Sequence, residues 1–282
     1  MAPMRMFLLR VFCLLAFAGI VPALAQQESA PLRLAVHPYA STLALINTYR
    51  PLQNYLATSL DRPVEFYTAP SFEGFVDTLL AGGYDIAISP PHFAVMASEK
   101  YYVPLLHYQT RLEPLLVVRA DSTLHKAEDF RGKRIAMADR SAFIRLVTVK
   151  WLGDHGLETG RDYRIVERPN HGAAISAAAM GEVDAGLATI TALKQLPVDV
   201  QQQVRTIGTS LRFPHLFTLA HRRLGDAEIA RIKQVLLAFP DTDEGRQFME
   251  KSGFKGFEEI SAEELCSVTP YVDLYRRMEE GR

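Results

Sequence analysis

Two stretches of the sequence share one pattern, LLAGGYDIAISPP (residues 79–91) and AAAMGEVDAGLATI (residues 177–190). Each leaves the end of a predicted helix, passes glycine and then an aspartate, Asp85 or Asp184, and enters a short run of small or apolar residues typical of a buried strand. A helix followed by such a strand is part of a β-α-β unit. Two separate copies in one chain predict two similar α/β lobes rather than one continuous sheet.

The positions of these two copies predict the boundaries of the lobes. We expect residues 32–118 to form the first part of lobe 1 and residues 119–214 to form lobe 2. Residues 215–282 are expected to return to lobe 1 and add C-terminal helices. Helices alternate with short apolar strands, which favours mainly parallel sheets flanked by helices. Because no long linker joins the lobes, two short crossovers are predicted to act as hinges.

The first 25 residues have the features of a signal peptide. Arg5 and Arg10 flank the start of an apolar run at residues 7–21, and Ala23-Leu24-Ala25 offers a small-x-small cleavage site. The run is shorter than the roughly 20 residues that span a bilayer. A cleaved signal at residues 1–25 and a periplasmic mature chain are therefore predicted, with an uncleaved anchor as the alternative.

Charge and cysteine content exclude some partners and an internal disulfide. Cleavage would remove two arginines and no acid, so the formal net charge would move from −1 to −3. A nearly neutral chain has no overall field to hold nucleic acid or a membrane surface, and neither is expected as a partner. Cys13 lies in the predicted signal segment, which leaves Cys266 alone and excludes an intramolecular disulfide in the mature chain.

Polar residues follow several predicted strands at the point where each strand ends. In open α/β sheets ligands bind beyond these ends, and the N-termini of the following helices favour anions. The predicted ligand-binding residues are His37, Tyr39, Tyr67, Ser89, His92, Arg140, Ser141 and His171. Alternatively, Ser89 and Ser141 are simple helix caps, and Tyr39, Tyr67 and His92 are core or rim residues.

Signatures of enzymes and metal sites are missing from the sequence. It contains no nucleophile elbow, phosphate-binding loop or dinucleotide fingerprint, and no closely spaced histidine pair. We therefore expect no catalytic residues, no cofactor and no metal. A hydrolase is the least favoured alternative, because no nucleophile–base pair can be named.

Taken together, four segments resemble the phosphate/phosphite/phosphonate-binding periplasmic proteins of ABC importers, which have the type 2 periplasmic binding fold. The segments are residues 82–97, 128–143, 171–188 and 214–220. The resemblance implies a small anionic ligand, closure of the lobes around it, and a partner permease in the inner membrane; we expect a monomer. Ser141 matches the anion-binding loop of that family, whereas Arg140 and Phe143 depart from it. Arg140 can still serve an anion, while Phe143 and the predicted cleft tyrosines favour a ligand with an apolar portion. A periplasmic sensing partner of a membrane receptor is the alternative.

Overall fold

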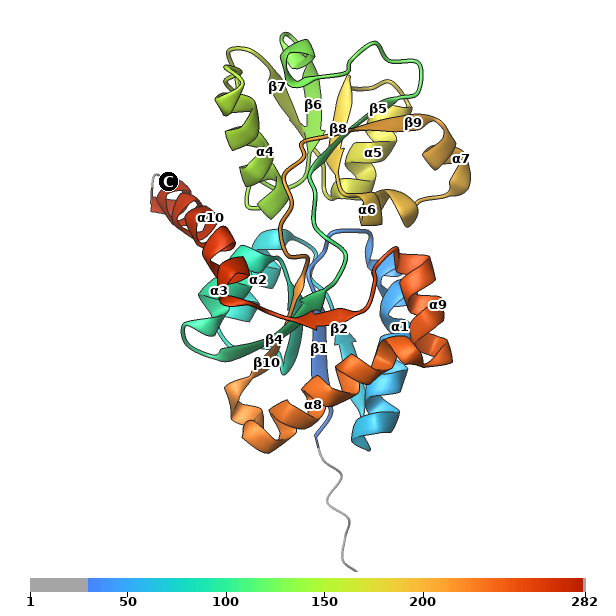
Figure 1. Ribbon diagram of the computed structural model, residues 1–282, viewed down its shortest axis with the longest axis vertical. Coiled ribbons are helices and arrows are strands. Elements are labelled where there is room, and N and C mark those ends of the chain that lie inside the picture. Colours follow the sequence, from blue (N-terminus) through green and yellow to red (C-terminus); the bar gives the residue numbers. More distant parts are fainter. Residues whose placement is uncertain (1–29, 281–282) are drawn as a thin grey trace, which may run out of the picture.

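The computed structural model describes residues 30–280, and the predicted signal segment lies outside this range. The chain forms two lobes, one above the other in Figure 1, each built on its own sheet. The first sheet has the order β11-β4-β10-β3-β1-β2 and the second has the order β7-β6-β8-β5-β9. The predicted two-lobed α/β architecture is thereby confirmed.

The strands of the first sheet are β1 (Leu32–Val36), β2 (Val64–Tyr67), β3 (Ile86–Ser89), β4 (Tyr102–Tyr108), β10 (Phe217–His221) and β11 (Phe257–Glu259). Those of the second sheet are β5 (Leu115–Arg119), β6 (Arg134–Met137), β7 (Arg164–Glu167), β8 (Ala185–Ala188) and β9 (Val204–Gly208).

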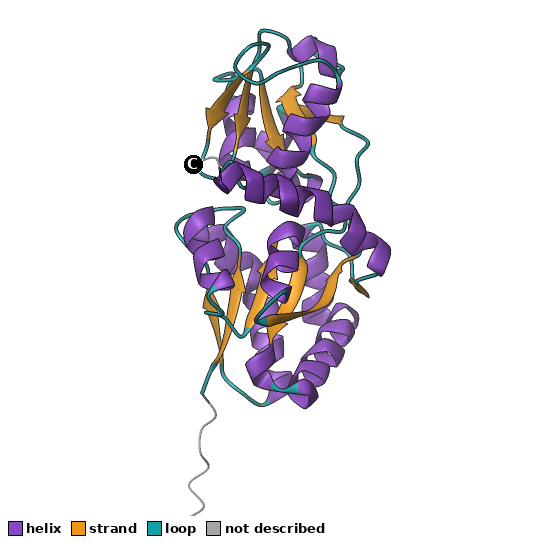
Figure 2. Cartoon of the chain, turned by 90° about the vertical axis from the view of Figure 1, so that its left-hand side faces the viewer, coloured by secondary structure: helices purple, strands orange, loops and turns teal. Residues whose placement is uncertain are grey.

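Helices cover both sheets (Figure 1). The first lobe carries α1 (Thr42–Leu60), α2 (Phe72–Leu80), α3 (Pro91–Ser98), α8 (Asp226–Ala238) and α9 (Asp243–Ser252). The second lobe carries α4 (Phe143–Asp154), α5 (His171–Ala179), α6 (Ile190–Lys194) and α7 (Val198–Gln202). The last helix, α10 (Ala262–Glu280), contacts α3 of the first lobe and α4 of the second, and runs across their junction in Figure 2. None of the helices within residues 30–280 is long and apolar enough to cross a membrane.

Both sheets are mixed, which corrects the prediction of mainly parallel sheets. In the first sheet β1 pairs in parallel with β2 and β3, but β10 runs antiparallel to β3 and β4. In the second sheet β5 runs antiparallel to β8 and β9. Strands β5 and β10 are those through which the chain enters one lobe from the other, so their direction follows from the crossovers and not from local β-α-β units. The short edge strand β11 also runs antiparallel, to β4.

The strand β5 also corrects the predicted boundary after residue 118, because it pairs only within the second sheet. The first crossover is therefore residues 109–114, and the second is residues 209–216. Leu112 and Phe213 join the two crossovers by reciprocal backbone hydrogen bonds of 2.9 and 3.0 Å. The two crossovers therefore lie side by side between the lobes.

The repeated stretch makes the same corner in each lobe. The Asp85 carboxylate accepts a hydrogen bond of 2.8 Å from the amide of Arg33 at the start of β1, and the Asp85 amide donates to the Arg33 carbonyl. Asp184 makes the same pair of bonds with Arg134 at the start of β6, again with 2.8 Å at the carboxylate. These equivalent corners explain why the two stretches look alike in the sequence.

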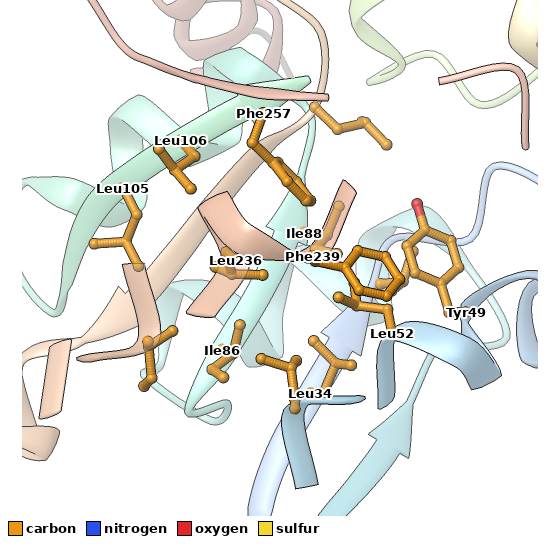
Figure 3. Packing of buried hydrophobic residues seen from close by; sticks show 14 of the residues in the cluster. Leu34, Tyr49, Leu52, Ile86, Ile88, Leu105, Leu106, Leu236, Phe239 and Phe257 are labelled. Atoms are coloured by element: carbon orange, nitrogen blue, oxygen red, sulfur yellow. The ribbon is translucent and has the colours of Figure 1, made fainter. Parts of the chain in front are cut away.

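Each lobe has its own core. In the first, apolar residues of β1 and β3, such as Leu34 and Ile86, pack against Leu52 of α1 and Leu236 of α8 (Figure 3). A separate cluster fills the second lobe around β6, α4 and β8. The two cores are separate clusters of buried residues, although Val95 and Met96 of α3 and two valines of α10 also pack against the core of the second lobe.

Candidate functional site

A cavity lies where the two lobes meet. Its walls come from both lobes and from both crossovers, and consist of His37, Tyr39, Phe72, Pro90, Leu112, Ala142, Phe143, Ile144, His171, Thr189, Thr191, His215, Leu216 and Phe254. Its volume is about 30 Å³, room for only about two water molecules. The lobes are therefore close together here, and a larger occupant requires them to separate.

The first lobe supplies His37 and Tyr39, which follow directly after β1. The His37 amide donates to the carbonyl of Ile88, so the loop continues the sheet for one more residue. The His37 ring lies 5.3 Å from the Tyr39 ring and 5.4 Å from that of Phe72, measured between ring centres. An aromatic wall therefore faces the second lobe from the carboxyl end of β1.

The second lobe supplies the starts of its helices. Phe143 begins α4, His171 begins α5, and Thr189 caps α6 by accepting from the Ala192 amide. The first amides of a helix have no partner within it and carry a partial positive charge, which suits an anionic oxygen. The starts of α4 and α5 therefore provide donors without a lysine or arginine side chain.

Hydroxyl groups and an imidazole form a short chain along one wall. The Thr191 hydroxyl lies 2.8 Å from that of Thr189 and 3.3 Å from His215 Nε2. His215 Nδ1 accepts from the Leu216 amide, which assigns the ring proton to Nε2 and makes Thr191 its acceptor. This wall is polar but uncharged.

The cavity histidines are neutral at physiological pH. Burial lowers the pKa of His171 to about 4 and that of His215 to about 3, and lowers the pKa of His37 well below its ordinary value. Burial likewise raises the pKa of Tyr39 to about 12, so its hydroxyl keeps its proton. All these groups can therefore exchange hydrogen bonds with a ligand without contributing net charge.

Two of the imidazole nitrogens are unsatisfied. Nδ1 of His37 and Nδ1 of His171 are buried and have no hydrogen-bond partner within residues 30–280. Buried polar atoms are nearly always paired with protein, water or ligand. One atom comes from each lobe and both residues line the same cavity, so a shared occupant would satisfy both.

Of the eight predicted residues, His37, Tyr39 and His171 line the cavity, while three others lie beside it. Ser89 is buried at the end of β3 and donates to the Pro90 carbonyl. Ser141 donates to Asp139 at 2.6 Å. Neither serine caps a helix, because the capping positions are Pro90 and Ala142. His92 Nε2 lies 2.9 Å from the Ser141 carbonyl and so joins the two lobes.

The structure does not bring Tyr67 and Arg140 to the cavity. The Tyr67 hydroxyl donates to Glu65 on the exposed edge of the first sheet. Arg140 pairs with Glu279 of α10 at 2.8 Å. Both residues lie at or just after strand ends as predicted, but their side chains pair with Glu65 and Glu279 and do not line the cavity.

Thr189, Thr191 and His215 also line the cavity, although they are not among the predicted residues. Thr189 directly follows β8 in the second repeated stretch, and Thr191 comes two residues later, so both could have been found by treating the two copies alike. His215 lies in the second crossover, where no strand-end pattern applies. His215 lines the cavity because the second crossover passes between the two lobes, where the cavity lies.

Two lobes with mixed sheets, joined by paired crossovers around a small cavity, define a two-lobed solute-binding protein. Residues 34–265 match the family model described as the periplasmic substrate-binding protein of phosphonate ABC transporters, and the chain belongs to this family. The proteins of this family bind solutes in the periplasm and serve a membrane permease; they are not enzymes.

Solved structures with low sequence identity share the fold. PhnD1 from Prochlorococcus marinus in complex with methylphosphonate has 14% identity and a TM-score of 0.75, covering 85% of this chain and 96% of that one. A binding protein component of an ABC phosphonate transporter from Pseudomonas aeruginosa gives 14% identity, a TM-score of 0.75, and coverage of 89% and 88%. A histidine kinase sensor domain similar to periplasmic binding proteins gives 16% identity, a TM-score of 0.57, and coverage of 81% and 99%.

Proposed function

We propose that the protein captures a small organic anion in the cavity between its lobes and delivers it to an ABC permease. The observation that carries this proposal is the pair of unsatisfied nitrogens, His37 Nδ1 and His171 Nδ1, which face one cavity from opposite lobes. A ligand that bonds to both stabilises the closed arrangement more than the open one, which is how binding drives closure.

The ligand carries a low charge and an apolar portion. No lysine or arginine is among the described residues that line the cavity, and its histidines are neutral. A doubly charged anion that entered this cavity would lose its bound water, and no positively charged side chain would replace it. Binding of a dianion would therefore have a high free-energy cost. A monoanionic head group can accept bonds from the starts of α4 and α5, while Phe72, Phe143 and Phe254 pack against its apolar part.

Entry and release require the lobes to part. The cavity is too small for a phosphonate in the arrangement described, so the hinge at residues 109–114 and 209–216 must open before binding. Because the two crossovers are bonded to each other, they bend as one element. A monomer with one cavity performs this cycle without a second copy.

Calorimetry with methylphosphonate, longer alkylphosphonates, methanesulfonate and inorganic phosphate tests this function. We expect methanesulfonate, which carries a single charge, to bind more tightly than phosphate, and the longer alkylphosphonates to bind more tightly than methylphosphonate. His37→Ala and His171→Ala should each weaken binding at least tenfold, whereas His125→Ala, at an exposed position, should bind as the wild type does. Failure of every anion to bind, or equal binding by the three variants, would refute the proposal.

Presentation of ligand to a membrane receptor is the second candidate. It is supported by the fold shared with the histidine kinase sensor domain. Both functions use the same cavity, so the membrane partner must distinguish them. A pull-down from solubilised membranes, with the ligand-bound protein as bait, identifies that partner. Recovery of a permease supports import, and recovery of a kinase supports sensing.

A further inference from the structure

Three side chains that could hold a metal ion meet in the first lobe, away from the ligand cavity. They are His107 on β4, Glu258 on β11 and Glu264 in the first turn of α10. Glu258 lies directly opposite His107 in the antiparallel pair of β11 and β4. One ligand atom from each of the three lies within 4.8 Å of the other two.

The protonation of His107 favours a metal ligand. Its ring is fully buried, and Nδ1 lies 2.8 Å from the carbonyl of Tyr108, so Nδ1 carries the proton and donates it. Nε2 then presents a lone pair. This is the arrangement typical of metal-binding histidines, in which a backbone carbonyl fixes the ring that binds the metal through its other nitrogen.

That lone pair faces two carboxylate oxygens. Nε2 lies 3.1 Å from Glu264 Oε1 and 3.5 Å from Glu258 Oε1. Neither His107 Nε2 nor Glu258 Oε1 has a hydrogen-bond partner within residues 30–280, although both atoms are buried. Three electron-rich atoms this close repel one another unless a proton or a cation lies between them.

The separations fit a cation. Two ligands bound to zinc at about 2.0 Å in a tetrahedron lie about 3.3 Å apart, and the two distances from Nε2 fall on either side of this value. Glu264 is also held in place, because its other oxygen, Oε2, accepts from the amide of Ser261 at 2.9 Å and from its hydroxyl at 3.1 Å. These bonds orient the carboxylate so that Oε1 points toward His107 Nε2.

We propose that His107 Nε2, Glu258 and Glu264 bind a divalent cation of the zinc type, with water completing the coordination. One imidazole and two carboxylates suit Zn²⁺ better than Ca²⁺ or Mg²⁺, which prefer oxygen ligands alone. The bound ion ties β11 and the start of α10 to the end of β4. It thereby anchors the C-terminal segment next to the first crossover.

Arg111 competes for this site. Its guanidinium contacts Glu264 Oε1 and lies 3.4 Å from Glu258 Oε1, the same two oxygens that face His107. Its side chain is 44% exposed and belongs to the first crossover, so it can swing away into solvent. A cation would displace it or compete with its charge, and removal of Arg111 should strengthen metal binding.

Zinc titration of the chelator-treated protein tests the site. We expect one ion per wild-type chain, a rise in melting temperature, and intense visible absorption of the Co²⁺ form, which is typical of tetrahedral coordination. His107→Gln and Glu264→Gln should lower zinc affinity at least tenfold. Arg111→Gln should raise it several-fold, and Glu259→Gln, whose carboxylate pairs with Lys233, should leave it unchanged.

The variants also separate this site from the ligand cavity. His171→Ala should bind zinc normally, because His171 is not part of the cluster, and His107→Gln should bind the organic anion normally. Circular dichroism confirms that each variant is folded. The proposal is overturned if the wild type takes up no zinc, or if His107→Gln takes up as much as the wild type; the two glutamates are then held by Arg111 without a metal ion.

Discussion

His92 Nε2 lies 2.9 Å from the carbonyl oxygen of Ser141, which makes a direct hydrogen bond between the two lobes. His92 belongs to α3 of the first lobe, and Ser141 directly precedes the cap of α4 in the second. Burial lowers the pKa of His92 to about 3, so the ring is neutral and Nε2–H is the donor. This bond holds the lobes together beside the cavity and does not require a ligand.

Replacing His92 should therefore favour the open form. His92→Phe keeps a ring that can pack against Phe93 and Phe143 but removes the donor. Loss of one such bond costs about 0.5–1.5 kcal/mol, so the ratio of closed to open molecules in the ligand-free protein should fall about two- to twelvefold, and the closed fraction with it. Single-molecule energy transfer between labels on the two lobes, with Cys266 replaced by serine, measures the fraction. Lys100→Gln is the control, and an unchanged closed fraction in His92→Phe would contradict the prediction.

The two equivalent corner aspartates should differ in their contribution to stability. Besides the Arg33 amide, Asp85 accepts two bonds from the Arg223 guanidinium, at 2.6 and 2.8 Å, and its side chain is 8% exposed. Burial alone would raise the pKa of Asp85, but the bonds from Arg33 and Arg223 outweigh it and lower the pKa. Within residues 30–280 the Asp184 carboxylate pairs with Arg134 alone, and its side chain is 34% exposed.

Asp85→Asn should lower the free energy of unfolding by about 2–4 kcal/mol, because a buried charge pair is broken. Asp184→Asn should cost less than about 1 kcal/mol. Urea denaturation measures both. Equal effects would mean that the Arg223 pair contributes nothing beyond the shared backbone bond.

Acid should destabilise the protein through its buried histidines. His92, His171 and His215 have an ordinary pKa of 6.5, which burial lowers to about 3, 4 and 3 in the folded state. Between pH 6.5 and about 4 the unfolded chain therefore binds protons that the folded protein does not. The stabilising contribution of these neutral histidines is therefore fully present above pH 6.5. Below that pH the free energy of unfolding falls by up to about 1.4 kcal/mol per pH unit for each histidine.

Denaturation curves between pH 4.5 and 7.5 test this dependence. His171→Gln should make the decline shallower, since one of the contributing groups is gone. His155→Gln is the matched control, because His155 is exposed and its replacement should leave the slope unchanged. A slope in His171→Gln as steep as in the wild type would exclude this explanation.

Two glycines of the second lobe should respond to alanine in opposite ways. A Cβ on Gly186 of β8 would lie 2.2 Å from the Ala174 carbonyl oxygen of α5, whereas one on Gly153 of α4 would meet nothing within 4 Å. Gly186→Ala should lower the free energy of unfolding by about 1–3 kcal/mol. Gly153→Ala should raise it by about 0.5–1 kcal/mol, because alanine favours the helix.

Gly186→Ala should also weaken ligand binding, since the helix that it pushes away begins with His171. Calorimetry and urea denaturation on both variants check the two effects. Normal ligand affinity in a destabilised Gly186→Ala protein would show that the position of α5 does not control the site.

Local patterns in the sequence were enough to predict the architecture. The corners at Asp85 and Asp184 depend on residues that are neighbours in a β-α-β unit, so their pattern is readable along the chain. The same holds for His37, Tyr39 and His171, because strand ends and helix starts fix their positions locally. The direction of β5 and β10 could not be read in this way, since it depends on how the chain passes between lobes.

The sequence by itself determined that the chain forms two α/β lobes and which loops lie at the ends of their strands. Only the tertiary structure decided which side chains of those loops meet. Arg140 bonds to Glu279, nearly 140 positions away in the sequence, and does not line the cavity. His92 forms a hydrogen bond between the lobes and does not line the cavity either. His215 joined the cavity from a crossover, and His107 met Glu258 and Glu264 from the end of the chain. The reason is physical: strand and helix periodicity are local, whereas pairing of charged and polar side chains depends on contacts between segments far apart in sequence.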